Sequence, residues 1–302
     1  MEAAVEVRDL TRRYGDSLAL DRVSLSLERD VIHGLLGRNG AGKTTLMSLM
    51  TAQDWPSTGD VEVLGQRPHE NEKVLPRICF VREDQRYIDD ARAAHAFRAA
   101  ARAFPRWDQA VADRLMADFR VPERTRIKKM SKGQRSAVGV IIGIASRAEV
   151  TFFDEPYMGL DAVARQLFYD RLLEDYAEHP RTIVLSSHLI DEIAHLVENV
   201  VVIDGGRILV DEPAEVLRGR AVTLVGRAEA VEEIVGSREV LHREALGRMV
   251  RTTVLGALDD AERHRVDELD VDLVPVSLQQ LVVRLTSREA GGGDSQELEE
   301  KS

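Results

Sequence analysis

The chain has 302 residues, of which 44% are hydrophobic and 31% charged, so it is long enough for one large domain and one smaller one. Its net charge of −11 and pI of about 5.3 argue against nonspecific binding to nucleic acid or to an anionic membrane surface, and we expect no nucleic-acid partner. No apolar run approaches the ~20 residues of a spanning helix, and the first residues lack the basic and apolar regions of a signal peptide, so we expect other chains to do any membrane crossing.

The first 85 residues alternate between strand patterns and one short helix pattern. Residues 23–27 alternate apolar and polar side chains, which is typical of a half-buried strand, whereas residues 31–36 form a continuous apolar run, which is typical of a buried strand. We expect strands over 5–7, 23–27, 31–36 and 61–64, and a helix over 44–51.

A mostly helical insert is predicted at about 86–146. Residues 91–104 are rich in Ala and Arg, which favours a helix, and Pro105 ends that helix. Asp108 is a suitable cap for the next helix, whose apolar face carries Val111, Leu115, Met116 and Phe119.

The alternation of strands and helices then resumes. We expect strands over 149–153, 182–186 and 200–203, a helix that begins at Asp161, and an amphipathic helix marked by Ile193, Leu196, Val197 and Val200. This order predicts an α/β fold with a largely parallel sheet covered by helices.

The pattern changes after about residue 220. Short strands over 222–225, 249–255 and 271–276 alternate with helices over 229–235, 259–269 and 278–285, which predicts a small α/β domain at 221–286. Residues 287–302 are rich in Gly, Ser and Glu, and we expect a disordered tail there.

A phosphate-binding loop is predicted between the apolar strand at 31–36 and the helix at 44–51. The segment Gly37-Arg38-Asn39-Gly40-Ala41-Gly42-Lys43-Thr44 fits the pattern G-x-x-x-x-G-K-[ST]. Its glycines let backbone N–H groups curl around phosphate oxygens, and the helix N-terminus adds partial positive charge. Lys43 is expected to reach the β- and γ-phosphates, and the Thr44 hydroxyl to ligate Mg²⁺.

Two carboxylates follow the apolar strand at 149–153. Asp154 suits the Mg²⁺ shell, and Glu155 suits orientation or deprotonation of an attacking water. The carboxyl ends of strands are where ligands bind in such folds, so we expect both acids near the loop that contains Lys43. His188 follows the next strand and is predicted to contact the γ-phosphate or the water.

With these residues in place, Met130-Ser131-Lys132-Gly133-Gln134-Arg135 resembles the signature sequence of ABC transporter ATPases, Leu-Ser-Gly-Gly-Gln. The resemblance covers roughly residues 3–220 and implies the P-loop fold of ABC ATPases, with a parallel core sheet, an antiparallel N-terminal subdomain and a helical subdomain. It implies an ATP-binding domain at 1–220. It also implies an ATP site that takes Ser131, Gly133 and Gln134 from the opposite subunit.

Further matches to the family complete the expected ATP site. Tyr14 matches the aromatic residue that stacks on adenine, Asp161 lies in the loop that couples two active sites, and His188 matches the switch histidine. The expected nucleotide-binding set is Tyr14, Gly37, Asn39, Gly40, Ala41, Gly42, Lys43, Thr44, Thr45, Ser131, Gly133, Gln134 and Asp161.

Three positions depart from the family's pattern. Lys132 replaces the first signature glycine, and Arg38 stands where the family usually has proline or serine. The glutamine that contacts Mg²⁺ and water in the family falls on Glu83, with Gln85 two residues later, so either Glu83 or Gln85 is a candidate metal-site residue.

The sequence therefore predicts an ATPase that uses ATP and Mg²⁺, with Lys43, Glu155 and His188 in the reaction. The segment 103–108 is similar to a branch of antibiotic and bacitracin exporters. That branch implies a separate permease, expected to have about six spans, and the ABC resemblance as a whole implies a second ATP-binding subunit, taken to be another copy of the chain. It also implies a peripheral position on the inner face of the cell membrane. The alternatives are a non-transport ABC ATPase that acts on a macromolecular complex and a sensor that does not hydrolyse ATP; the intact Asp154, Glu155 and His188 disfavour the sensor.

Overall fold

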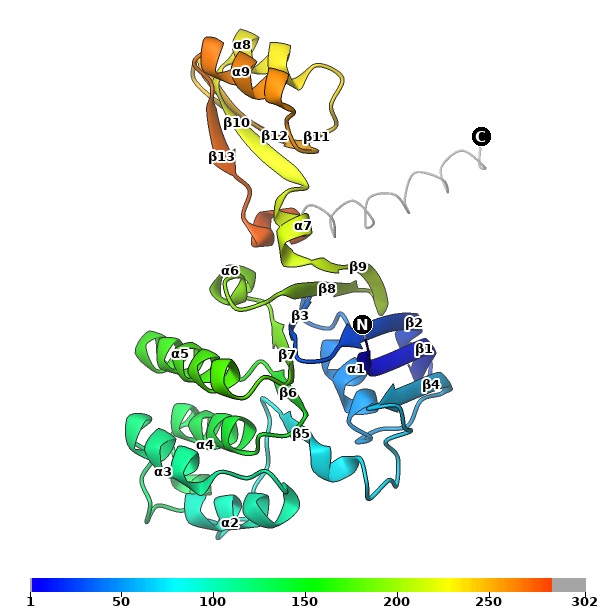
Figure 1. The fold of residues 1–302 in the computed structure, drawn as a ribbon, viewed down its shortest axis with the longest axis vertical. Helices are drawn as coiled ribbons and strands as arrows, with labels where there is room; N and C mark the ends of the chain where they lie inside the picture. Colours follow the sequence, from blue (N-terminus) through cyan, green and yellow to red (C-terminus); the bar gives the residue numbers. More distant parts are fainter. Residues whose placement is uncertain (1, 284–302) are drawn as a thin grey trace. The chain divides into compact units, whose positions relative to one another are not determined.

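The central feature of the computed structural model, which describes residues 2–283, is a six-stranded sheet (Figure 1). Its strand order is β5-β6-β7-β3-β8-β9, and the first five of these run parallel. The strands are β3 (Ile32–Leu36), β5 (Ile78–Val81), β6 (Val150–Asp154), β7 (Thr182–Ser187), β8 (Asn199–Asp204) and β9 (Arg207–Pro213). The strands β3, β6 and β7 are buried along their whole length, as expected for a parallel sheet covered on both faces.

A second, antiparallel sheet is formed near the N-terminus by β1 (Ala3–Tyr14), β2 (Ser17–Glu28) and β4 (Thr58–Val63), in the order β2-β1-β4. Helix α1 (Lys43–Met50) contacts strands of both sheets, and six of its eight residues are buried. A helix covered on nearly all sides belongs to a core. The phosphate-loop helix is therefore fixed between the two sheets.

The helical insert consists of α2 (Ala93–Ala103), α3 (Gln109–Asp118) and α4 (Lys132–Ala145), and α5 (Ala162–Glu178) follows β6 (Figure 1). Helix α2 ends before Pro105, and the Asp108 carboxylate caps α3 by accepting the Val111 N–H at 3.0 Å, as the sequence predicts. Helix α4 packs against β5 and β6 through Gly139 and Gly143. Short 3₁₀ turns lie at Leu75–Arg77 and Ile127–Lys129.

The chain divides into two compact units, one formed by residues up to 188 with 195–211, and the other by residues 189–194 and those from 212 onward. The second unit contains an antiparallel sheet of order β11-β12-β10-β13. Its elements are α6 (Ile190–Ile193), α7 (Ala214–Arg218), β10 (Ala221–Arg227), α8 (Ala228–Val235), β11 (Val240–Leu246), β12 (Met249–Leu255), α9 (Asp260–Glu268) and β13 (Asp272–Pro275). Residues 278–283 are helical, and both the rest of the helix predicted to 285 and the predicted tail at 287–302 lie outside the described residues.

One predicted element is wrong and one strand was missed. Of the four residues taken to mark an amphipathic helix, only Ile193 lies in α6, because Asn199 and Val200 pair with β3 in the sheet and their backbone cannot also be helical. Val197, in the turn before β8, is buried against Gly34 instead. Strand β11 was not expected, because its sequence Val-Leu-His-Arg-Glu-Ala-Leu carries three polar residues in a row and lies at a sheet edge. In residues 2–283 we find no helix with both the length and the apolar character that a bilayer crossing requires.

Helix α4 depends on the absence of a side chain at Gly143. A Cβ there would lie 2.3 Å from Cε1 of Phe153 and 2.8 Å from Cγ2 of Val81. We expect Gly143→Val to lower the free energy of unfolding by about 2 kcal/mol, since overpacking forces neighbours off their rotamers. Urea denaturation followed by circular dichroism checks this. Gly219→Val is the control, because a Cβ added at Gly219 would lie 3.5 Å or more from its nearest neighbours. An equal loss of unfolding free energy in both variants contradicts the prediction.

Candidate functional site

The loop at residues 37–44 joins the end of β3 to the start of α1 and is folded around the ammonium group of Lys43. The Lys43 Nζ donates to the carbonyl of Gly37 at 2.8 Å and to that of Arg38 at 3.2 Å. Gly42 has a φ of +111°, a conformation that L residues rarely adopt. A Cβ at Gly37 would lie 2.2 Å from the carbonyl oxygen of Ile203. The glycines of the motif are therefore required by both backbone conformation and packing.

A pocket opens beside this loop, in front of the N-terminus of α1. The residues that line it come from the loop, from β2 and from two acidic positions: Ala19, Asn39, Gly40, Gly42, Lys43, Thr44, Thr45, Glu83 and Glu155. Gly37 and Ala41 belong to the loop but do not line this pocket; Ala41 is buried, and its N–H donates to the Arg38 carbonyl at 3.2 Å. The structure thus brings most of the expected phosphate-binding residues to one concave surface.

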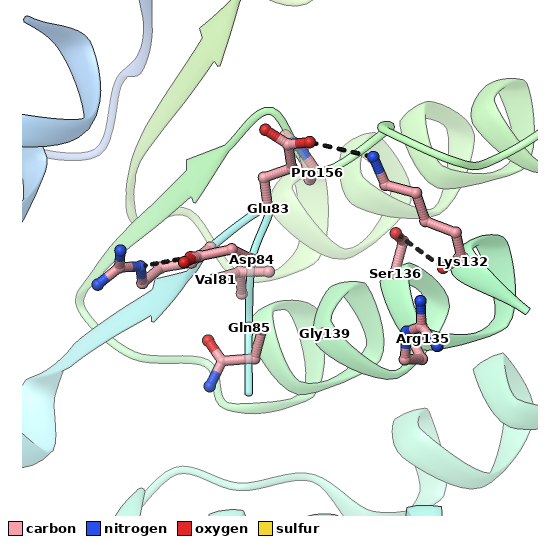
Figure 2. Close-up of a pocket in the computed structure, with 10 residues that line it drawn as sticks. Val81, Glu83, Asp84, Gln85, Lys132, Arg135, Ser136, Gly139 and Pro156 are labelled. Atoms are coloured by element: carbon pink, nitrogen blue, oxygen red, sulfur yellow. Dashed lines mark hydrogen bonds and ion pairs between the residues drawn. The ribbon is translucent and has the colours of Figure 1, made fainter. Parts of the chain in front are cut away.

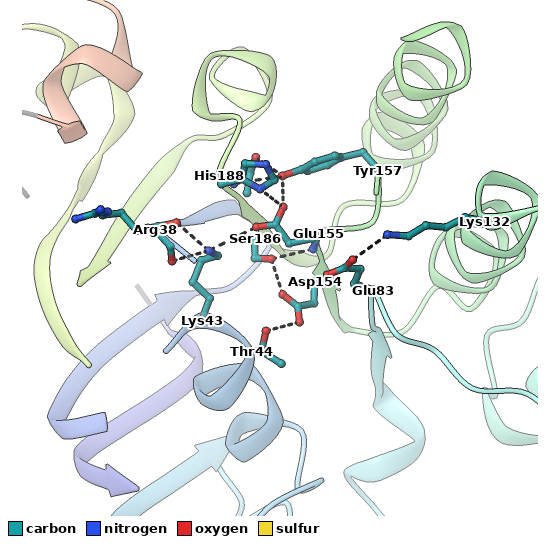
Figure 3. Close-up of polar contacts among 12 residues, drawn as sticks. Arg38, Lys43, Thr44, Glu83, Lys132, Asp154, Glu155, Tyr157, Ser186 and His188 are labelled. Atoms are coloured by element: carbon teal, nitrogen blue, oxygen red, sulfur yellow. Dashed lines mark hydrogen bonds and ion pairs between the residues drawn. The ribbon is translucent and has the colours of Figure 1, made fainter. Parts of the chain in front are cut away.

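Asp154 ends β6 and lies between two hydroxyl groups. Thr44 Oγ1 donates to one carboxylate oxygen at 2.7 Å, and Ser186 Oγ donates to the other at 2.7 Å (Figure 3). Burial raises the pKa of the Asp154 carboxyl above its ordinary value, and the hydrogen bonds from Thr44 and Ser186 oppose that rise. Ser186 also accepts the N–H of Glu155 at 2.9 Å, a contact that the sequence did not reveal.

The oxygens of Thr44 and Asp154 fit Mg²⁺, which prefers hard oxygen ligands and keeps several waters when it binds with substrate phosphates. Within residues 2–283, no group of three or more His, Cys, Asp or Glu side chains is placed to hold a metal ion. A metal here therefore needs phosphate oxygens and water to complete its shell.

Glu155 follows Asp154 with a left-handed backbone, φ +48°, which turns its side chain back over the phosphate loop. Its Oε1 lies 3.5 Å from Lys43 Nζ and has no hydrogen-bond partner, and its Oε2 lies 2.8 Å from Nδ1 of His188. Figure 3 shows Lys43, Glu155 and His188 converging from three different elements. The structure therefore brings together the three residues that the sequence predicts for the reaction.

A buried tyrosine, Tyr157, completes this group and was missed by the sequence reasoning. Its hydroxyl contacts the Glu155 carboxylate, the Ser187 hydroxyl at 3.0 Å and Nδ1 of His188 at 3.2 Å (Figure 3). The only signal in the sequence was its place two residues after Glu155, in Glu155-Pro156-Tyr157.

Glu83 and Gln85, the two candidates for the glutamine position, lie on different sides of the loop after β5. Glu83 lines the pocket beside Lys43 and also accepts a bond from Lys132 Nζ at 3.1 Å, whereas the Gln85 side chain points away from Glu83 and Lys132 (Figure 2). Gln85 does not line the pocket beside Lys43. By position, Glu83 is therefore the better candidate.

The remaining predicted residues lie away from this pocket. The Tyr14 hydroxyl bonds to Asp54, and the Arg12 guanidinium stacks on the Tyr14 ring at 4.3 Å from its centroid. Ser131 is the N-cap of α4 and accepts the N–H of Gln134 at 3.2 Å, and a Cβ on Gly133 would lie 2.5 Å from the Gly159 carbonyl. Asp161 caps α5 through the Ala164 N–H at 2.8 Å. None of these residues lines the pocket beside Lys43.

Comparison with known proteins shows which proteins this chain is similar to. The ABC transporter family model matches residues 20–158. The chain is 29% identical over 224 residues to the bacitracin transport ATP-binding protein BcrA of Bacillus licheniformis, covering 73% of each. It is 27% identical over 308 residues to the daunorubicin resistance ATP-binding protein DrrA3 of Streptomyces coeruleorubidus, covering 94% of this chain and 96% of DrrA3.

A solved structure described as the ATP-binding subunit of an ABC transporter superposes with a TM-score of 0.64 at 24% identity, covering 71% of this chain and 92% of that one. This likeness shows the fold. The predicted fold class, a P-loop α/β domain with a parallel core sheet and an antiparallel N-terminal sheet, is confirmed.

Ser186 gives a test of how the acidic pair is held. We expect Ser186→Ala to weaken Mg²⁺ binding about tenfold, because the Asp154 carboxylate loses a donor that favours its charged form. It should also lower the free energy of unfolding by about 1–3 kcal/mol, because the Glu155 N–H is left buried without a partner. Mg²⁺ titration of nucleotide binding and urea denaturation measure the two effects.

Ser146→Ala is the matched control. Ser146 is buried, and its hydroxyl donates to the Gly143 carbonyl at 2.9 Å, away from the pocket. It should lose stability and keep its Mg²⁺ affinity. Equal Mg²⁺ affinities in the two variants would contradict a role for Ser186 at the metal site.

Proposed function

We propose that this chain works as one half of a dimer that energises a separate export permease. It belongs to the ABC transporter ATP-binding proteins and hydrolyses ATP to drive transport. The observation that carries the proposal is the meeting of Lys43, Asp154, Glu155 and His188 at one edge of the parallel sheet. Export is supported by the similarity to the bacitracin transport and daunorubicin resistance ATP-binding proteins.

The phosphate loop supplies binding and charge. Backbone N–H groups and the N-terminus of α1 face the bound phosphates, and Lys43 exchanges its contacts with the Gly37 and Arg38 carbonyls for phosphate oxygens. Thr44 and Asp154 would hold Mg²⁺, which supplies positive charge against the β- and γ-phosphates when bound. Tyr14 would stack on adenine with the ring face that Arg12 does not cover.

Glu155 and His188 then act on the attacking water and the γ-phosphate. Water attacks the γ-phosphorus in line with the leaving ADP oxygen, and the Glu155 carboxylate orients that water or takes its proton. His188 fixes a γ-phosphate oxygen. Because these groups are already in place before ATP binds, little reorganisation accompanies the reaction.

A second subunit would complete each site. Ser131 and Gly133 lie at the N-terminus of the 14-residue helix α4, where free N–H groups favour an anion, yet they do not line the chain's own phosphate pocket. We place them against the γ-phosphate held by the opposite subunit. Another copy of this chain suits that role, since it carries both the phosphate loop and the signature.

The permease would dock on the helical insert, from the inner face of the membrane. An apolar groove lies between β5, α2 and α4, lined among others by Phe80, Tyr87, Ala100, Phe104 and Ile142. Beside it Ile88 is 84% exposed, which is unusual for a large apolar side chain. A permease with about six spans would present a short cytoplasmic segment to this groove.

Two substitutions test the ATPase assignment. We expect Glu155→Gln to keep its affinity for ATP and to hydrolyse ATP at least about 100-fold more slowly, because an amide cannot accept the proton of the attacking water. Lys43→Ala should lose ATP affinity because the phosphate charge loses its cation. Phosphate release and a fluorescent-nucleotide titration provide the two measurements.

Glu178→Gln is the control for the first variant, since Glu178 is exposed at the end of α5. It should match the unmodified chain. Full turnover in Glu155→Gln would contradict the role of Glu155 in the reaction. Unchanged ATP affinity in Lys43→Ala would contradict the assignment of residues 37–44 as the phosphate-binding loop.

A further inference from the structure

We infer that Tyr157 is a positioning residue for ATP hydrolysis, whose hydroxyl holds Glu155 and His188 in one hydrogen-bonded group. The inference rests on the roles proposed above for Glu155 and His188. Tyr157 does not line the pocket beside Lys43, so we infer that it acts through the residues that it contacts.

The contacts of Tyr157 bridge two loops. Tyr157 lies in the loop after β6 and is 3% exposed, and its hydroxyl reaches the residues that end β7 (Figure 3). It bonds to the Glu155 carboxylate and Ser187, and it accepts the backbone N–H of His188 at 3.2 Å. Fixing one phenol therefore fixes both loops that carry the proposed reacting side chains.

When Glu155 acts as the proposed base it carries no proton, and the donors and acceptors around it then allow one arrangement of protons. A phenol has one proton and an ionised carboxylate only accepts, so the Tyr157 O–H donates to Glu155. The same rule places a proton on Nδ1 of His188, which lies 2.8 Å from Glu155 Oε2. Burial raises the pKa of Tyr157 well above its ordinary range, so the phenol keeps its proton.

The hydroxyl also limits a competing contact of Glu155. Glu155 Oε1 lies 3.5 Å from Lys43 Nζ, beyond hydrogen-bond distance, while Oε2 is held by Tyr157 and His188. Without the phenol, His188 alone holds Oε2, and the carboxylate can turn further toward the ammonium and form a tighter buried pair. The proposed base would then point away from the attacking water, whereas the ammonium, which has three donors, could still contact phosphate oxygens.

Tyr157→Phe tests the inference, because it removes the hydroxyl and keeps the buried ring. We expect kcat to fall at least about tenfold, with the KM for ATP changed less than about twofold, because binding groups are untouched. Tyr176→Phe is the matched control: its hydroxyl bonds to the Asp30 carbonyl at 2.6 Å and to Glu198 at 2.8 Å, outside the site. That variant should keep its kcat.

A double variant separates positioning from a merely structural role. In a Glu155→Gln background, Tyr157→Phe should lower the single-turnover rate no further, because the two residues act as one unit. An additive loss, or an unchanged kcat in Tyr157→Phe alone, overturns the inference. If Glu155→Gln itself keeps full turnover, the proposed role of Glu155 fails first, and the inference fails with it.

A second observation concerns two residues that depart from the family's pattern. Glu83 and Lys132 are 49 residues apart in the chain, yet Lys132 Nζ lies 3.1 Å from Glu83 Oε1 (Figures 2 and 3). Glu83 also lines the pocket that contains Lys43 and Thr44. The stem of Lys132 packs over Gly159, where an added Cβ would lie 2.6 Å from the Lys132 Cγ.

We propose that Lys132 compensates the charge of Glu83 at the edge of the phosphate pocket, so that each departure makes the other tolerable. A carboxylate at this position repels the phosphates of ATP, and an ammonium 3.1 Å away neutralises that repulsion. This proposal rests on the phosphate pocket alone and not on the reacting residues.

A double-mutant cycle tests the pair. Lys132→Met keeps the stem and removes the charge, and we expect it to raise the KM for ATP about fivefold, a modest effect because both side chains are partly exposed. Glu83→Gln should return the KM of that variant close to that of the unmodified chain.

Lys128→Met is the control, because Lys128 pairs with Asp89 and Asp90 instead. Its KM should stay unchanged. If Lys132→Met raises the KM by the same factor in the unmodified chain and in the Glu83→Gln variant, the two residues act separately and the proposal is wrong. Whether this pocket binds ATP at all is tested separately, by the ATP affinity of the Lys43→Ala variant.

Discussion

Parallel pairing of β6, β7 and β3 is the constraint on which the site depends. The register places Asp154 beside Ser186 and Leu36 beside Ser187, so the three strands end at one level. The phosphate loop, the acidic pair and the loop with His188 each begin at one of these ends. A shift of one strand would separate groups that now lie within hydrogen-bond distance, which is why a buried, two-sided sheet suits this chemistry.

Apart from Oε1 of Glu155, the buried charged groups of the site are hydrogen-bonded within the chain. Lys43 is only 7% exposed and is held by two backbone carbonyls and, more distantly, by Glu155, while Asp154 is held by Thr44 and Ser186. Buried ions are costly unless they are paired and hydrogen-bonded. The atoms that make these contacts are also those proposed to meet phosphate and metal. ATP would therefore replace existing partners instead of inducing a new arrangement.

The local motifs made much of the fold and the pocket predictable. The phosphate loop and the acidic strand are contiguous in sequence, and their strand and helix neighbours carry clear periodicity, so their positions follow from the chain itself. Tyr157 and Ser186 could not be predicted, because their partners lie about 30 residues away and are brought close only by the pairing of β6 with β7. The spacing of the motif also did not decide whether Glu83 or Gln85 takes the glutamine position, because the direction of a loop side chain depends on what packs against it.

The central claim is that the site is incomplete in one chain and is completed by Ser131 of a second copy. Sedimentation of the Glu155→Gln chain with and without Mg-ATP tests it most directly. The account predicts that ATP doubles the mass, and that adding Ser131→Arg to that chain keeps it monomeric, since the bulky cation blocks the γ-phosphate contact. A mass that ATP leaves at one chain, or a doubling that survives Ser131→Arg, would contradict it.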